Sequence, residues 1–372
     1  MPEIIELDHD FCMLVGALSI YQIIRIATMF DTYMFTRIST GNETKMKGIR
    51  IFLKKHDLSV DNDVEFFVVA YSGTSIIGCG GIASNILKSI AITPELQGSG
   101  FSLKLMSELT NYAYEMGRFH LFLFTKPSNV KFFRQAGFFK IANAGDKLSL
   151  LENSKNGLEK YCNKLKKWKV PGDKIASIVM NANPFTFGHQ FLAEKAASEC
   201  DWLHLFVVKE EGSEFSYHDR FEMIRKGTQH IQNLTLHPGS KYIISRVTFP
   251  TYFIKDKGVI DYCHTAVDLQ LFRDHIAPYL GITHRYIGTE PQCVVTNNYN
   301  QQMQQWLISP LLESPKIEVI EVPRITTNNN PISASTVRGL LIRGDTEHLA
   351  DYLPKTTIEH LNHHAAREPV AA

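Results

Sequence analysis

The sequence lacks paired cysteines, long basic runs and an uninterrupted apolar span. Its six cysteines include no CxxC pair, and the amino terminus has no basic segment followed by an apolar one, so we expect a cytoplasmic protein without disulfides. With 39 Lys and Arg against 38 Asp and Glu, the formal charge of +1 argues against nucleic-acid binding and against membrane-surface binding. The apolar stretch from Phe11 to Phe30 contains Gln22 and Arg25, which makes it too interrupted to span a membrane.

The length of 372 residues predicts two domains. Residues 1–45 are uncertain: Leu14 to Met29 favours a helix, and Thr36 to Lys47 is typical of a polar connector. Residues 46–153 show a regular β-β-β-α-β-α-β order. The strands are expected at Glu65 to Tyr71, Ser75 to Ile82, Leu87 to Ile92, Leu121 to Thr125 and after Gly137, and the helices up to His56, from Ser99 to Met116 and from Asn129 to Gln135.

Residues 154–174 are polar and lysine-rich, and Pro171 and Gly172 interrupt them, so we interpret them as a linker with a solvated helix. In residues 175–372, apolar strands alternate with longer helices, which predicts a Rossmann-like parallel sheet with crossover helices. Ligands of such sheets bind beyond the carboxyl ends of the strands. The predicted strands are Ile175 to Met180, Trp202 to Val208, Tyr242 to Ser245, His284 to Ile287 and Ile317 to Glu321.

A candidate phosphate-binding turn follows the first strand of this second domain. It consists of Asn183, Pro184, Phe185, Thr186, Phe187, Gly188 and His189, before a helix from Gln190 to Glu199. A helix start offers backbone N–H groups and the positive end of the dipole, and Thr186 and His189 share one face of its first turn. A histidine at this position can also serve only as a cap. A second element near the end of the domain strengthens the functional interpretation: Ser333, Ser335, Thr336 and Arg338 open another helix.

The two elements together resemble the nucleotidylyltransferase superfamily, whose signature is HxGH or TxGH after the first strand and ISSTxxR before a late helix. A third fragment, Gly288, Thr289 and Glu290, ends a strand where that superfamily contacts the nucleotide. The resemblance implies that Thr186 and His189 stabilise the α-phosphate transition state and that Arg338 binds the departing pyrophosphate. It also implies that ATP enters with Mg²⁺, that no cofactor is tightly bound, and that no protein nucleophile is needed.

The first domain has a glycine-containing loop between a strand and a helix, formed by Ile92, Gln97, Gly98, Ser99 and Gly100. Glycines there let backbone amides approach a pyrophosphate at the helix start, although a plain strand-turn-helix would have the same pattern. The loop and the order of elements resemble the GNAT fold, which holds coenzyme A in this way. No residue identifies itself as an acetyltransferase base.

The combination of both sites resembles the citrate lyase ligase family over nearly the whole chain after residue 46. The resemblance implies an acid-thiol ligase that activates acetate with ATP as acetyl-AMP. The acceptor would be the phosphoribosyl-dephospho-coenzyme A thiol of the citrate lyase acyl-carrier (gamma) subunit, with AMP and pyrophosphate released. Two enzymatic alternatives stay open: a nucleotidylyltransferase that adenylates a phosphopantetheine-type phosphate, and a protein N-acetyltransferase. A non-catalytic binding module is a third.

Several other polar residues invite a role. Asp261, His264 and Asp268 could share a helix face, and we interpret them as a hydrogen-bonded or substrate-facing cluster rather than a metal site. Lys209 could bind substrate or phosphate, and Arg220 could anchor the acidic loop beside it. We expect His360, His363 and His364 to face solvent, so no metal site is predicted.

Overall fold

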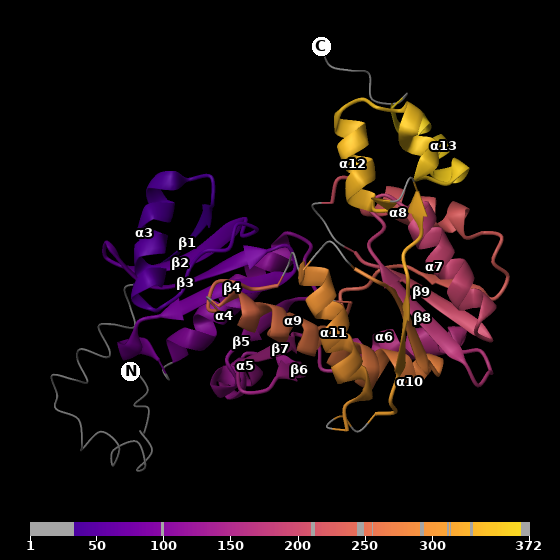
Figure 1. The fold of residues 1–372 in the computed structure, drawn as a ribbon. Coiled ribbons are helices and arrows are strands. Elements are labelled where there is room, and N and C mark those ends of the chain that lie inside the picture. The colour runs from indigo at the N-terminus through magenta and orange to yellow at the C-terminus, as the bar shows by residue number, and fades with distance from the viewer. Residues whose placement is uncertain are drawn as a thin grey trace, which may run out of the picture. The chain divides into compact units, whose positions relative to one another are not determined.

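The computed structural model (Figure 1) describes residues 33–97, 100–209, 213–243, 249–254, 256–290, 294–310, 312, 314–327 and 330–365. The contacts divide the chain into two compact units. One holds the described residues up to Leu123 together with Thr251–Phe253, and the other holds Phe124–Pro250 and the residues from Ile254 onward. The division falls inside a strand, and the predicted boundaries at residues 153 and 174 stay predictions.

The first unit is built on an antiparallel sheet. Its strands are β1 (Tyr33–Ser39), β2 (Phe66–Ser72), β3 (Ser75–Ala83) and β4 (Ile86–Ile92), each antiparallel to the next, while β4 pairs in parallel with β5 (Phe122–Thr125). Two helices pack on it, α3 (Glu43–Lys55) and α4 (Gly100–Glu115). The predicted strands of residues 46–125 are confirmed to within one residue at each end, and the predicted helix ends at His56 and Met116 to within one residue, whereas α3 begins earlier than predicted.

The interpretation of residues 36–47 as a polar connector was wrong. They contain most of β1, whose side chains alternate between solvent and core, and the start of α3. Ile38 and Met46 are buried, and the Asn42 side chain caps α3 by accepting from the Lys45 N–H at 3.2 Å. Few apolar residues suffice here because the sheet supplies the rest of the core.

The second unit begins with the last residues of β5 and a short helix. After α5 (Val130–Gln135), β6 (Phe139–Ala144) and β7 (Leu148–Glu152) form an antiparallel pair. The complete strand order is β1-β2-β3-β4-β5-β7-β6. The sequence predicted β6, and β7 was missed.

The helix α6 (Gly157–Leu165) lies within the lysine-rich stretch. The sequence predicted a solvated helix here, and the lysines of the helix are indeed exposed, while Leu158, Cys162 and Leu165 are buried on one face. Its start is tied to β7 by the Glu152 carboxylate, which accepts from the Leu158 N–H at 3.0 Å. The lysines cover the opposite face, as in an ordinary amphipathic surface helix.

The second sheet has five parallel strands in the order β10-β9-β8-β11-β12. They are β8 (Ile175–Met180), β9 (Trp202–Val207), β10 (Leu234–His237), β11 (His284–Gly288) and β12 (Glu318–Val322). The predicted strand from Tyr242 to Ser245 was wrong: Tyr242 and Ile243 lie in a turn, the next two residues lie outside the described part, and β10 is formed instead by Leu234–His237. The strand order changes direction between β8 and β11, so a switch point lies there.

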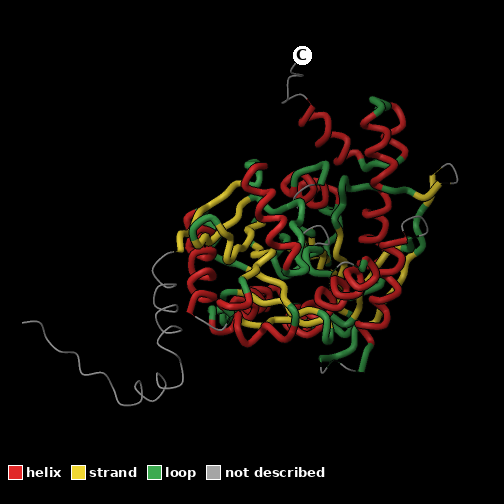
Figure 2. Tube along the Cα trace, turned by 90° about the vertical axis from the view of Figure 1, so that its left-hand side faces the viewer, coloured by secondary structure: helices red, strands yellow, loops and turns green. Residues whose placement is uncertain are grey.

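Figure 2 distinguishes the helices, in red, from the strands, in yellow, and the contacts place helices on both faces of this sheet. On one face lie α7 (Phe187–Ser198) and α8 (Tyr217–Gly227); on the other lie α9 (Lys257–Gln270), the π-helical turn η4 (Leu271–Ile276), α10 (Ala277–Leu280) and α11 (Val294–Ile308). Two further helices, α12 (Ala334–Ile342) and α13 (Lys355–Ala365), are joined by a short 3-10 segment. No helix among the described residues combines the length and the apolarity needed to cross a bilayer.

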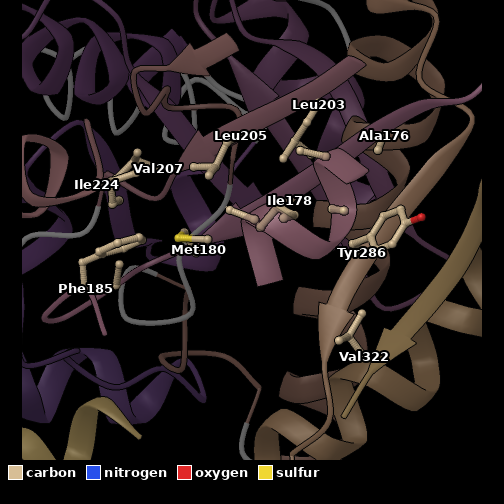
Figure 3. Packing of buried hydrophobic residues seen from close by; sticks show 14 of the residues in the cluster. Ala176, Ile178, Met180, Phe185, Leu203, Leu205, Val207, Ile224, Tyr286 and Val322 are labelled. Carbon is tan, nitrogen blue, oxygen red and sulfur yellow. The ribbon is translucent and has the colours of Figure 1, made fainter. Parts of the chain in front are cut away.

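The core between the sheet and α7 and α8 fixes the position of the candidate phosphate turn. Figure 3 shows Met180, Phe185, Val207 and Ile224 packed together at the end of β8. Phe185 has no exposed surface, so the turn that follows β8 is anchored in the core by its own side chain. The residues after Phe185 therefore emerge at the carboxyl edge of the sheet.

Candidate active site

A cavity of about 860 Å³ lies at the carboxyl ends of β8 and β11 in the second unit. It collects residues from all three fragments that the sequence singled out, namely Asn183, Thr186, Gly188, His189, Gly288, Glu290, Ser333, Ser335 and Arg338. Because Asn183 and Arg338 are 155 residues apart in the chain, the fold itself assembles the site. The volume lies within the range of small-molecule sites.

Thr186 is the N-cap of α7, and His189 lies in the first turn of that helix. The backbone N–H of Thr186 donates to Nδ1 of His189 at 3.1 Å, and the Thr186 hydroxyl lies 2.9 Å from the same nitrogen. An amide nitrogen can only donate, so Nδ1 is the acceptor and the neutral imidazole carries its proton on Nε2. The capping contact thus leaves an N–H donor at the distal end of the ring.

His189 is neutral at physiological pH. Desolvation lowers its pKa to about 4, and the nearby positive charge of Arg324 contributes in the same direction. The ring of Phe185 stacks on the imidazole with centroids 5.8 Å apart. A neutral ring with a fixed Nε2–H can donate to a developing phosphate oxyanion without first gaining a proton.

The helix α12 brings a second helix start and a cation to the cavity. The sequence left the cap of this helix open between Ser333 and Ser335, and Ser333 is the cap, accepting from the Thr336 N–H at 3.1 Å. Arg338 donates from Nη1 to the carbonyl oxygen of Asn183 at 2.6 Å, which links this helix to the turn before α7. Two helix N-termini and one guanidinium therefore serve the same cavity, a combination suited to polyphosphate.

The end of β11 is held by an arginine that the sequence analysis did not single out. Arg324 donates from Nε to the carbonyl oxygen of Thr289 at 2.7 Å and forms an ion pair with the Glu290 carboxylate. Asn300 donates to the carbonyl oxygen of Gly288 at 3.1 Å. These contacts fix the turn after β11, and at Gly288 no heavy atom would meet an added Cβ.

The comparisons with known proteins agree with this assembly. Residues 175–361 match the family model described as Citrate lyase ligase C-terminal domain, and residues 38–147 match the Acetyltransferase (GNAT) domain. [Citrate [pro-3S]-lyase] ligase of Klebsiella pneumoniae is 53% identical over 86% of this chain and 93% of its own. The ligases of that name from Escherichia coli and Haemophilus influenzae are 48% and 49% identical over 90% and 88% of this chain, and over 95% and 98% of their own lengths.

The chain belongs to the citrate lyase ligase family. The fold class is likewise that predicted from the sequence: a mixed GNAT-like sheet precedes an all-parallel sheet of five strands. The identity extends over nearly the full length of the three relatives, so it includes both halves of the chain.

Four predicted nucleotide contacts lie outside the cavity lining of this citrate lyase ligase family member: Pro184, Phe185, Thr289 and Thr336. Phe185 is in the core, and Thr289 accepts from the Arg324 N–H at 3.1 Å through its hydroxyl. The Thr336 N–H is used by the Ser333 cap. These residues lie next to the cavity lining without forming part of it, and their predicted contacts with the nucleotide stay predictions.

The predicted carrier-arm loop is described in part. Ile92 ends β4, the Gln97 side chain donates to the Ile92 carbonyl oxygen at 3.2 Å, and Gly100 begins α4. Gly98 and Ser99 lie outside the described residues. The strand-loop-helix order is as expected from the sequence.

Three acidic or histidine side chains of α9, Asp261, His264 and Asp268, line the cavity, in agreement with the interpretation as a substrate-facing cluster. Within the described ranges, no three His, Cys, Asp or Glu side chains are arranged to hold a metal ion. Beside them, Arg285 of β11 also lines the cavity and was not singled out from the sequence. It is taken up below.

Arg220 and His360 form buried polar contacts. Arg220 has no exposed surface and donates to the carbonyl oxygens of Asn181, Val208 and Phe215, so it anchors both ends of the acidic loop as proposed from the sequence. The expectation that His360 faces solvent was wrong. It is 8% exposed, and its Nε2 lies 3.0 Å from the Asp219 carboxylate because α13 packs on α8.

Proposed function

We propose that this chain activates acetate with ATP as acetyl-AMP and transfers the acetyl group to the phosphoribosyl-dephospho-coenzyme A thiol of the citrate lyase acyl-carrier subunit, thereby activating citrate lyase. The observation that carries the proposal is the convergence of the two helix starts, His189 and Arg338 on one cavity. Membership of the citrate lyase ligase family supports the choice of acid and acceptor.

In the first step, a carboxylate oxygen of acetate forms a bond to the α-phosphorus of ATP, and the bond from that phosphorus to the bridging oxygen of the β-phosphate breaks. Pyrophosphate leaves with the electron pair. The Nε2–H of His189 donates to the α-phosphate oxygen on which charge grows, and the start of α7 adds its dipole. Arg338 and the start of α12 neutralise the departing pyrophosphate.

In the second step, the carrier thiol forms a bond to the acetyl carbonyl carbon, the bond from that carbon to the AMP oxygen breaks, and the thiol proton passes to solvent. We assign reception of the carrier arm to residues 46–153, and specifically to the loop from Gln97 to Gly100. Residues 154–174 then connect this part to the adenylyl-transfer domain, residues 175–372.

Magnesium belongs to this scheme as part of the substrate, bound to the phosphates of ATP. The carboxylates in the cavity lining are Asp261, Asp268 and Glu290, of which Glu290 is paired with Arg324. In this proposal the ion is held by the phosphate oxygens of the nucleotide, and oxygen ligands of that kind are the ones that Mg²⁺ prefers.

The test is pyrophosphate release from MgATP by the purified full chain, with and without acetate, followed by addition of the thiol form of the acyl-carrier subunit. We expect release that depends on acetate, AMP formation that depends on the carrier, and a carrier mass increased by one acetyl group. Release that ignores acetate but responds to a phosphopantetheine compound and gives a stable dinucleotide would favour the nucleotidylyltransferase. Acetylation from acetyl-coenzyme A without ATP would favour the acetyltransferase.

A further inference from the structure

We propose that Arg285 is the binding group for the carboxylate of the acid substrate, in a subsite distinct from the phosphate-binding helix starts. The inference rests on the proposed function and names the residue that would select a carboxylic acid. Arg285 belongs to β11, three residues before Gly288, and only 3% of its surface is exposed. Its side chain lines the cavity from strand β11.

The guanidinium of Arg285 has donors that the protein does not use. Its Nε and Nη1 atoms are buried and have no hydrogen-bond partner, and among the described residues no carboxylate lies within ion-pair distance of it. A buried charged donor without a partner is costly, so such a group points to a ligand that completes it. The carboxylate of Asp268 attracts the guanidinium electrostatically without an ion-pair contact, and it accepts a hydrogen bond from the Tyr299 hydroxyl at 2.6 Å.

The surroundings of Arg285 suit a small monoanion with a short apolar tail. The guanidinium lies over the ring of Phe272, 4.4 Å from its centroid, and Ile287 and Met303 add apolar surface to the cavity. One cation matches the single charge of a carboxylate, whereas the several charges of a polyphosphate are matched by the helix starts and Arg338. Three residues of strand separate Arg285 from Gly288 by about 10 Å.

The experiment compares Arg285→Gln and Arg285→Lys with wild type by titrating acetate and ATP separately in the pyrophosphate-release assay. We expect Arg285→Gln to raise the KM for acetate about 10- to 100-fold, because a charged hydrogen-bond donor is lost, while the KM for ATP stays within about 3-fold. Arg285→Lys keeps the charge without the planar fork and should fall between. Arg273→Lys is the matched control: this buried arginine does not line the cavity and should change neither KM.

A second readout does not depend on turnover. Saturation-transfer NMR of the acetate methyl group should show binding to wild type and to Arg273→Lys, and loss of binding in Arg285→Gln, with the folded state checked by thermal unfolding. An unchanged KM for acetate, or an equal rise in the KM for ATP, would overturn the subsite. If wild type binds acetate through Arg285 but releases no pyrophosphate, the subsite stands and the proposed reaction fails.

Discussion

Arg273 and Arg285 are both buried arginines on the helix-covered face that includes η4, yet their hydrogen bonding is opposite. Arg273 donates to four backbone carbonyl oxygens, those of Trp306, Ser309, Ser314 and Pro315, at 2.8–3.1 Å. Arg285 leaves Nε and Nη1 without partners and borders a cavity. Burial lowers the pKa of both groups. Hydrogen-bond satisfaction rather than burial therefore separates the structural arginine from the proposed ligand-binding one.

The largest expected effect on stability tests this difference directly. Arg273→Met leaves four carbonyl oxygens without their donor, so we expect the free energy of unfolding to fall by on the order of 4 kcal/mol. Urea unfolding followed by tryptophan fluorescence measures it, since Trp168, Trp202 and Trp306 all lie in the second unit.

Arg285→Met is the comparison variant for that measurement. It removes donors that have no partner, so its loss of stability should be clearly smaller than that of Arg273→Met. Equal losses would mean that the number of hydrogen bonds made by each arginine does not decide how much it contributes to stability.

His189 carries both kinds of polar atom in one ring, a paired Nδ1 and an Nε2–H directed to ligand in our proposal. His189→Asn places an acceptor near the Nδ1 position but has no distal N–H, so it should stay folded and lose about 100- to 1000-fold in kcat. His189→Gln places an N–H near the distal position and loses the cap, so it should keep more activity and lose about 1 kcal/mol of stability.

The measurement is acetate-dependent pyrophosphate release together with the urea midpoint of each variant. If both variants lose activity equally and only in proportion to stability, His189 is a cap and the assignment of its distal nitrogen is wrong. If His189→Asn alone is inactive at wild-type stability, the two functions of the ring are separated.

The sequence predicted the part of the site that depends on local chemistry. A small hydroxyl, a glycine and a histidine between a strand and a helix indicated the turn at Thr186 to His189, and Ser333 or Ser335 was predicted as the cap of the late helix. Four of the five parallel strands were also found, and two of them, β8 and β9, are buried and largely apolar, as is typical of parallel strands.

Residues whose role comes from tertiary packing could not be found in this way. Arg285 lies in a strand and Arg324 in a loop, and neither belongs to a recognisable sequence motif. Only the fold places them at the cavity. His360 was predicted to face solvent because nothing in the neighbouring sequence indicates that α13 packs on α8. The strand Leu234–His237 is only 4 residues long and contains Thr235 and His237, whereas the predicted segment after it begins with three apolar residues, Tyr242, Ile243 and Ile244.

A third pair of buried polar groups extends the comparison to pH. His204 and His237 are buried on neighbouring parallel strands. Nδ1 of His204 lies 2.9 Å from Nε2 of His237, and Nε2 of His204 has no hydrogen-bond partner. Burial lowers the pKa of His204 to about 4 and that of His237 to about 3, with the charge of His204 adding to the latter. Neither imidazole gains a proton in the folded state until the pH is well below 6.5.

These depressed pKa values fix the sign of the pH dependence. Between pH 6.5 and about 4 the unfolded chain binds protons that the folded chain does not, so stability is fully present above pH 6.5 and falls as the pH is lowered. Each histidine contributes a slope of up to about 1.4 kcal/mol per pH unit. Urea unfolding at several pH values should show that the free energy of unfolding of His204→Asn depends less steeply on pH than that of wild type. The control is His348→Asn at an exposed position, which should leave the slope nearly unchanged. Asp345 raises the pKa of His348, so this histidine gives only a weak slope of opposite sign. An unchanged slope in His204→Asn would mean that the fold does not lower the pKa of His204.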